Sequence, residues 1–296
     1  IAIKDVSDAI LWSWHVWVTD EDINNVIEIT NHQNVKYNFM PVNLGQCDGN
    51  TITYEERSCK VKFIAGDQSK EITIKQLANV IATGSNAPFY QWGRKDPLYP
   101  SNGMGNTTKI WYDKEGIPST ANPMKGTFSA GNDCIKNCIL NPNLMHNRYN
   151  GDYTYYNLWS ADNKTTSAND NPVNKTIYDP CPVGFKLPAS NAFTGFTTTG
   201  ESVSSSTQVN GTWSSSEKGW YFYTNSEKTQ SIFFPALGYR SYSTMRPGRI
   251  GTQGCFWSEH PVAKGNNYYL RTSSVDVQPT YMVDRGFGYA LRPCQD

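Results

Sequence analysis

Short runs of apolar and aromatic residues recur along the chain, and clusters of Gly, Ser, Asn and Arg separate them. Runs of this length between such clusters predict strands joined by exposed loops. The pattern is clearest between residues 233 and 294, where no window supports a long helix. We therefore predict a β-rich α+β fold that forms a single elaborated domain over residues 1–296.

Residues 1–20 predict two strands around a turn. The second run, Ile10 to Val18, carries large apolar residues on both faces, which is typical of a strand covered on both sides. We expect a central strand here, with His15 as a hydrogen-bonded core residue.

Residues 38–97 predict a short strand, a β-hairpin and a short helix. The runs 59–63 and 71–75 each alternate cleanly, so we expect a hairpin that projects Lys and Glu outward. A helix over 74–81 is the alternative, since periodicity over so short a window does not exclude it. Prolines and a glycine bracket the aromatic stretch 87–97 and predict a short helix there.

Residues 98–174 are rich in Asn, Gly, Ser, Thr and Tyr but retain several large apolar residues, which predicts an ordered, irregular surface layer. Residues 175–296 follow as the carboxyl-terminal core. They open with three prolines and a glycine between Pro180 and Pro188, which predict a rigid turn. A brief helix is expected around 189–196.

Composition favours an extracellular β protein. Charged residues make up 18% and aromatic residues 13% of the chain, and Lys plus Arg equal Asp plus Glu at 26 each. This balance gives no net field to attract nucleic acid or anionic lipid, and no apolar run approaches the ~20 residues of a membrane span. Because Ile1 follows no start Met or signal-like run, we expect a fragment that lacks an upstream domain.

Seven cysteines stand at positions 47, 59, 134, 138, 181, 255 and 294. An odd number cannot pair fully within one chain, and the spacing lacks the paired Cys-x-x-Cys units of a zinc site. We predict no metal site and no cofactor. The preferred disulfides are Cys47 with Cys59, Cys134 with Cys138, and Cys181 with Cys294, which leave Cys255 as an interior thiol. The alternative is seven reduced, mostly buried thiols.

The loops of the carboxyl-terminal region carry residue types that are enriched at recognition hot spots because they bury large area at low entropic cost. The candidate ligand-binding residues are Tyr239, Tyr242, Arg246, Arg249, His260, Tyr268 and Arg285. No Gly-x-Ser-x-Gly elbow, His-Glu-x-x-His zinc helix or phosphate-binding Gly loop is present, so the sequence favours recognition over catalysis.

Four motifs in order resemble surface proteins of Bacteroidetes: 10–17 (Ile-Leu-Trp-Ser-Trp-His-Val-Trp), 90–97 (Tyr-Gln-Trp-Gly-Arg-Lys-Asp-Pro), 178–188 (Tyr-Asp-Pro-Cys-Pro-Val-Gly-Phe-Lys-Leu-Pro) and 286–292 (Gly-Phe-Gly-Tyr-Ala-Leu-Arg). Over nearly its whole length the chain is similar to the Fibrobacter succinogenes major paralogous domain, found in fimbrillin-like proteins and lipoproteins of gut Bacteroides.

That resemblance implies a C-type-lectin-like fold with long irregular loop insertions, in which the chain ends meet in one sheet. A disulfide between Cys181 and Cys294 fits this closure. Calcium-dependent sugar binding is not expected, because the Glu-Pro-Asn, Gln-Pro-Asp and Trp-Asn-Asp tripeptides are absent and Gln278-Pro279-Thr280 lacks the carboxylate.

The leading hypothesis is a non-enzymatic cell-surface adhesin that binds a host or bacterial surface glycan or protein. The alternative is a hypervariable receptor-binding protein of a phage tail or a diversity-generating retroelement. Both allow fimbrial or tail subunits as partners. A structural pilin subunit is a third hypothesis, and a formylglycine-generating type of enzyme with Cys255 as its reactive thiol is a fourth.

Overall fold

The computed structural model describes residues 1–46, 52–81, 87–98, 111–112, 117–119, 131–146, 158–162, 164–262 and 265–296. The described residues are β-rich, as the alternating pattern predicts, with few and short helices. None of the helices among these residues is long and apolar enough to cross a membrane.

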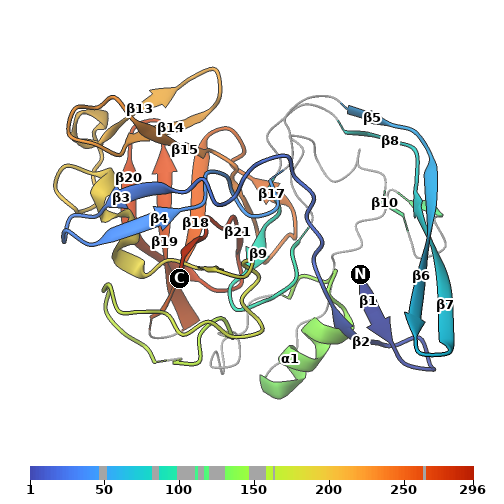
Figure 1. Ribbon diagram of the computed structural model, residues 1–296. Coiled ribbons are helices and arrows are strands. Elements are labelled where there is room, and N and C mark those ends of the chain that lie inside the picture. Colours follow the sequence, from blue (N-terminus) through green and yellow to red (C-terminus); the bar gives the residue numbers. More distant parts are fainter. Residues whose placement is uncertain are drawn as a thin grey trace.

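The main body contains two antiparallel three-stranded sheets (Figure 1). One joins β18 (Gln253–Pro261), β19 (Asn266–Ser273) and β20 (Val277–Asp284), and the other joins β13 (Gly211–Ser214), β14 (Gly219–Tyr223) and β15 (Ser231–Pro235). Short hairpin connections make both of them local meanders, which the runs between 211 and 284 predict.

Two further sheets join segments that are distant in sequence. The first has the order β12 (Phe185–Lys186), β22 (Cys294–Gln295), β4 (Lys36–Phe39) and β3 (Ile27–Thr30). The second has the order β17 (Pro247–Gly248), β16 (Tyr239–Arg240), β21 (Gly288–Tyr289) and β9 (Tyr90–Gln91). The carboxyl-terminal strand is therefore held against a strand from the first 40 residues.

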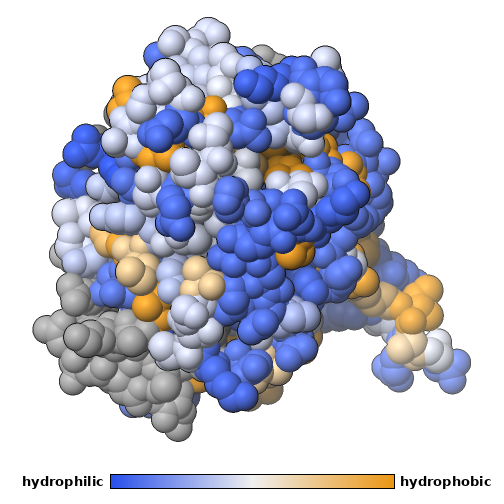
Figure 2. Space-filling model, turned by 90° about the vertical axis from the view of Figure 1, so that its left-hand side faces the viewer, coloured by the Kyte–Doolittle hydropathy of each residue, from blue (hydrophilic) through white to orange (hydrophobic). Residues whose placement is uncertain are grey.

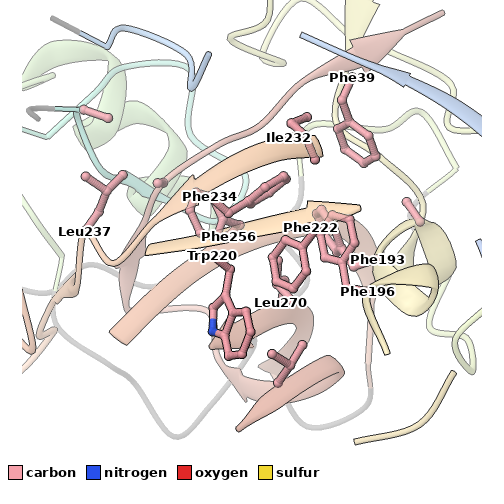
Figure 3. Packing of buried hydrophobic residues seen from close by; sticks show 14 of the residues in the cluster. Phe39, Phe193, Phe196, Trp220, Phe222, Ile232, Phe234, Leu237, Phe256 and Leu270 are labelled. Atoms are coloured by element: carbon pink, nitrogen blue, oxygen red, sulfur yellow. The ribbon is translucent and has the colours of Figure 1, made fainter. Parts of the chain in front are cut away.

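A cluster of aromatic side chains fills the space between these sheets (Figure 3). Phe196 stacks on Phe222 with ring centroids 3.9 Å apart, and the edge of Phe234 meets Phe222 at 5.7 Å and Phe256 at 4.9 Å. Phe196 comes from a 3-10 helix, η2 (Ser190–Phe196), which confirms the brief helix expected there. Burial of each ring contributes about 2–3 kcal/mol, so this cluster is the main source of the body's stability.

The face that Figure 2 shows belongs to the side of the body with β3, β13 and β20. Hydrophilic residues cover most of it, and the hydrophobic residues occur in small separate groups. This face offers no broad apolar surface.

A long β-hairpin extends away from the body (Figure 1). It consists of β6 (Arg57–Ala65) and β7 (Gln68–Gln76), preceded by β5 (Ile52–Tyr54) and followed by β8 (Asn79–Ile81), which pair with each other. The predicted hairpin is confirmed, and the alternative helix over 74–81 is wrong. Two shorter strands, β10 (Trp111–Tyr112) and β11 (Pro118–Ser119), also pair.

The two amino-terminal strands are present as predicted, but the prediction that the second of them is central is wrong. β1 (Ala2–Lys4) and β2 (Ile10–Ser13) form a separate two-stranded sheet, and Trp14, Val16 and Val18 lie beyond it as exposed residues. The apolar run instead packs against α1 (Gly131–Leu140) and places Trp12 against Tyr178 with ring centroids 5.6 Å apart. His15 accordingly is exposed, although its Nδ1 lies 3.0 Å from the Tyr90 hydroxyl.

Two local predictions in the next segments also need correction. The aromatic stretch 87–97 is no helix: it contains β9 and a turn, because Phe89 and Leu98 exchange backbone hydrogen bonds and Gly93 has a φ of 86°. The layer 98–174 contains the helix α1. Much of the rest of that layer lies outside the described residues.

Candidate functional site

Three half-exposed aromatic side chains meet beside the β16–β17 hairpin. The Phe287 ring packs edge to face with Tyr242 at a centroid distance of 4.8 Å and with Tyr239 at 5.4 Å. Arg246 and Arg249 are exposed on the same connection, between β16 and β18. Together these five residues form the aromatic–arginine surface.

Gly238 fixes the position of Tyr239. The backbone at Gly238 has a φ of 74°, and a Cβ there would lie 2.2 Å from the carbonyl oxygen of Gly248. Only glycine allows both this conformation and this close approach. The β16–β17 hairpin, with Tyr239 opposite Gly248, consequently depends on this one residue.

A closed turn carries Tyr242 and Arg246. The Ser241 amide donates to the Arg246 carbonyl at 3.0 Å, and the Met245 amide donates to the Ser241 carbonyl at 2.8 Å. The buried Arg240 guanidinium also holds this turn, because it donates to the Met245 carbonyl at 3.0 Å. Met245 is buried in the core, whereas Tyr242 is half-buried and Arg246 is exposed, so one side chain anchors the turn while two others reach its surface.

A second turn positions Phe287. The Gly286 amide donates to the Asp284 side chain at 2.8 Å, and Gln91 Nε2 donates to the Gly286 carbonyl at 2.7 Å. A Cβ on Gly286 would lie 3.1 Å from the Cβ of Tyr242, so the two turns are packed closely together. Phe287 and Tyr242 thus approach each other from turns held by independent hydrogen bonds.

Buried aromatic residues form the floor of this surface. Phe287 stacks on Tyr289 at 5.7 Å, and Tyr289 in turn packs on Trp257 at 4.3 Å. Trp257 Nε1 donates to the Tyr90 carbonyl at 2.8 Å. Burial raises the pKa of the Tyr289 phenol well above its ordinary value, so this ring is uncharged near neutral pH.

The electrostatic character of this surface is cationic. The segment 238–252 contains three arginines and no acidic residue. Within the described part of the chain, neither Arg246 nor Arg249 forms an ion pair. Two guanidinium groups are therefore available to carboxylate, sulfate or phosphate groups, which they can bind through paired hydrogen bonds.

Four of the seven predicted contact residues, Tyr239, Tyr242, Arg246 and Arg249, come together on the aromatic–arginine surface. The prediction that His260, Tyr268 and Arg285 lie on exposed loops is wrong, since all three are buried. His260 lies in β18 and its Nδ1 is 2.9 Å from Ser190 Oγ, and burial lowers its pKa so that it is neutral.

The other two buried residues are also structural. Arg285 stacks on the Trp92 ring at 4.4 Å and donates to the Asn266 and Val262 carbonyls. Tyr268 lies in the central strand β19 and is 9% exposed. Neither of these side chains reaches a ligand on the outer surface.

The six cysteines in the described part of the chain are thiols, so the predicted disulfides are not formed there. Cys134 and Cys138 are one turn apart on α1, where Cβ atoms lie about 5–6 Å apart while a disulfide needs about 3.5–4.5 Å. Cys181 and Cys294 are both buried, and Cys59 is exposed on β6. Its predicted partner, Cys47, lies outside the described residues.

Cys255 is a buried thiol, as expected, and desolvation raises its pKa far above the ordinary range. Such a thiol is a poor nucleophile near neutral pH. The structure therefore gives no support to Cys255 as a reactive residue.

Phe287 is the contact candidate that the sequence analysis missed. Its signal is the short segment Gly286-Phe287-Gly288, in which a large apolar side chain stands in a turn between two glycines. A turn residue of this type, with no neighbour of its own size beside it, is a candidate for exposure.

Within the described residues, no group of three or more His, Cys, Asp or Glu side chains is placed to hold a metal ion. The aromatic–arginine surface therefore offers hydrophobic and cationic contacts rather than metal ligands. The chain matches no protein-family model, no curated protein and no solved structure, so the site is defined by its own geometry.

Proposed function

We propose that the chain is a non-enzymatic ligand-binding domain of a cell-surface adhesin, and that the aromatic–arginine surface makes the contact with the ligand. The single observation that carries this proposal is the arrangement of Tyr242 and Phe287, which pack 4.8 Å apart from two separately held turns. Preorganised aromatic side chains lose little entropy when a ligand binds.

The chemistry of this surface favours a surface glycan or glycoprotein that carries acidic groups. Exposed faces of Tyr and Phe rings pack against the apolar faces of sugar rings, and Arg246 and Arg249 supply donors for anionic substituents. The ligand is bound outside the cell, with fimbrial subunits as further partners. No step of bond making or breaking is assigned to these side chains.

A C-type-lectin-like scaffold is part of the proposal. Its support is the sheet that holds the carboxyl-terminal strand against an early strand, with Cys294 opposite Phe39. The Met40 amide also donates to the Pro293 carbonyl at 2.9 Å. In this scaffold the chain closes by backbone pairing, while the ligand surface lies on the loops.

A glycan and host-protein array tests the proposal. The wild-type chain is compared with a variant that combines Tyr242→Ala, Phe287→Ala and Arg246→Ala, and with a control that combines Tyr221→Ala and Arg57→Ala at other surfaces. The first variant loses binding by at least about tenfold, while the control binds like the wild type, with and without EDTA. Equal binding by both variants, or binding that EDTA abolishes, contradicts the proposal.

A further inference from the structure

A small cavity lies between α1 and the turn that follows β9. Its volume of about 20 Å³ holds one water-sized molecule, which excludes an organic ligand. Arg94 and Lys95 line one side, and Cys134 and Cys138 line the other. The aromatic–arginine surface contains none of these residues.

The two cysteines lie on one face of α1. They are four residues apart in a helix, so their side chains are neighbours. Cys134 is 2% exposed, whereas Cys138 is partly exposed. A hydrogen bond from Cys134 lowers the pKa of Cys138 well below the usual range of a thiol, and the nearby Arg94 charge lowers it further.

Arg94 is a buried cation that has no anionic partner among the described residues. It is 5% exposed, and its hydrogen-bond acceptors among these residues are uncharged: the Leu144 carbonyl, the Pro142 carbonyl at 3.1 Å and Gln91 Oε1 at 3.2 Å. No carboxylate in the described part of the chain forms an ion pair with it. A buried charge without a counter-ion is costly, and a Cys138 thiolate removes that cost.

The other charges around the cavity are balanced. Lys95 Nζ lies 2.6 Å from Asp96 Oδ2, so the two form an ion pair of their own. Ser13 Oγ donates to the remaining oxygen of Asp96 at 2.7 Å. On α1, Asp133 and Lys136 are exposed. Among the described residues that line the cavity, Arg94 is thus the cation that no carboxylate pairs with.

His146 completes the cluster. It is 2% exposed and lies beside Cys138, whose pKa it also lowers. Neither imidazole nitrogen has a well-formed hydrogen bond to the described residues. An imidazole in this position can take up the thiol proton and later return it.

We propose that Cys138 is a reactive thiolate and a site of oxidation by small hydroperoxides such as hydrogen peroxide. The sulfur attacks one peroxide oxygen, so that an S–O bond forms and the O–O bond breaks, and two electrons pass from sulfur to the peroxide. The hydroxide that leaves takes the proton from His146 and departs as water. The product is a sulfenic acid at Cys138.

The helix protects this product. A disulfide with Cys134 requires Cβ atoms about 3.5–4.5 Å apart, which an intact turn of α1 does not allow. The sulfenic acid therefore persists until a thiol from outside reduces it or α1 opens. The reaction at Cys138 uses no residue of the aromatic–arginine surface.

Peptide-resolved mass spectrometry of the native chain tests the proposal, with iodoacetamide as the first probe. Cys59, the exposed thiol on β6, is the internal reference. At pH 6, Cys138 reacts about tenfold faster than Cys59, while Cys181, Cys255 and Cys294 react only after unfolding. Brief hydrogen peroxide followed by dimedone labels Cys138 before Cys59.

Two variants separate reactivity from structure. Arg94→Gln slows labelling of Cys138 at pH 6 by about tenfold, and Arg94→Lys, which keeps the charge, restores part of the rate. If Arg94→Gln does not fold, the pH dependence of iodoacetamide labelling in the wild-type chain tests the proposal instead. The proposal requires the midpoint of Cys138 labelling to lie at a lower pH than the midpoint of Cys59 labelling. Equal midpoints, or an unchanged rate in a folded Arg94→Gln, overturn the proposal.

Discussion

Arg292 Nε donates a hydrogen bond to Asn43 Oδ1 at 2.7 Å and so ties the segment before the last strand of the chain to its first 50 residues. The same guanidinium donates to the Pro41 carbonyl at 3.0 Å and to the Phe233 carbonyl at 2.7 Å, and it stacks on the Phe234 ring at 4.4 Å. Arg292 is fully buried. One side chain thus holds three segments that are distant in sequence.

Replacement of Arg292 by Met should lower the free energy of unfolding by about 3 kcal/mol, because several buried acceptors lose their donors at once. Urea denaturation measures the change. Arg246→Met, at an exposed position, is the matched control and should change stability by less than about 0.5 kcal/mol. Equal midpoints for the two variants would show that Arg292 does not hold these segments together.

Alanine substitutions at Gly238 and Gly184 together test how closely the backbone at Gly238 approaches the facing strand of the β16–β17 hairpin. Both glycines have positive φ, 74° and 83°, but a Cβ at Gly184 meets nothing within 4 Å. Gly184→Ala should cost about 1 kcal/mol from backbone strain alone. Gly238→Ala should cost at least about 2 kcal/mol more, because the Gly248 carbonyl must move. Thermal unfolding of both variants gives the comparison, and similar costs contradict the close approach.

Sequence periodicity predicts local elements well where apolar and polar residues alternate along an exposed strand. The hairpin β6–β7 was predicted because Val61, Phe63, Ile72 and Ile74 alternate with polar and charged residues. α1 was missed, although Cys134, Ile135, Cys138 and Ile139 repeat with the helical period. This helical repeat is hard to recognise because the surrounding residues are polar and glycine-rich.

Periodicity along the chain does not predict which distant segments pair with each other. The run Ile10 to Val18 has the composition of a core strand, yet it packs on α1 at one end and is exposed at the other. Likewise, a sequence does not reveal which face of β18 or β19 is covered, so His260 and Tyr268 were mistaken for surface residues. Tyr242 lies in a loop and is half-buried, but its contact with Phe287 depends on two turns that only the folded chain brings together.

Glu259 should make the stability of the protein fall as pH rises. Burial raises its pKa to about 8, although a hydrogen bond with Ser160 partly offsets the shift. The folded state thus binds the proton more tightly than the unfolded state, in which the pKa is about 4.5. The stabilisation by this proton is complete below pH 4.5 and is lost as pH rises through 8.

Glu259→Gln removes this ionisation and should be more stable than the wild type at pH 8.5, with a smaller difference at pH 5. Urea denaturation at the two pH values measures the change. His260, whose pKa burial lowers, has the opposite dependence and loses stability as pH falls below about 6.5. Because His260 Nε2 lies 3.8 Å from Glu259 Oε2, the two groups are coupled, so a third measurement at pH 7, above the range in which His260 titrates, isolates the contribution of Glu259. A difference that does not grow with pH would place the Glu259 pKa near its ordinary value.

The hairpin β6–β7 should be the least protected part of the described sheet structure. Its register places Cys59, Val61, Phe63, Ile72 and Ile74 on one face. Phe63, Ile72 and Ile74 are exposed, and the opposite face carries the Lys60–Glu71 ion pair at 3.0 Å. A two-stranded hairpin open on both faces is marginally stable in water. Its amides should exchange with deuterium at least about 100-fold faster than those of β19, which is buried between two strands.

Hydrogen exchange read by mass spectrometry checks this expectation at two protein concentrations. Faster exchange in 57–76 than in β19 at both concentrations is the expected result. Protection of 57–76 that disappears on dilution would instead mean that a second copy covers the apolar face of the hairpin. In that case Phe63→Ser, which removes the largest ring from that face, should restore fast exchange at the higher concentration. Ile64→Ser, on the opposite face beside it, is the matched control and should leave the protection unchanged.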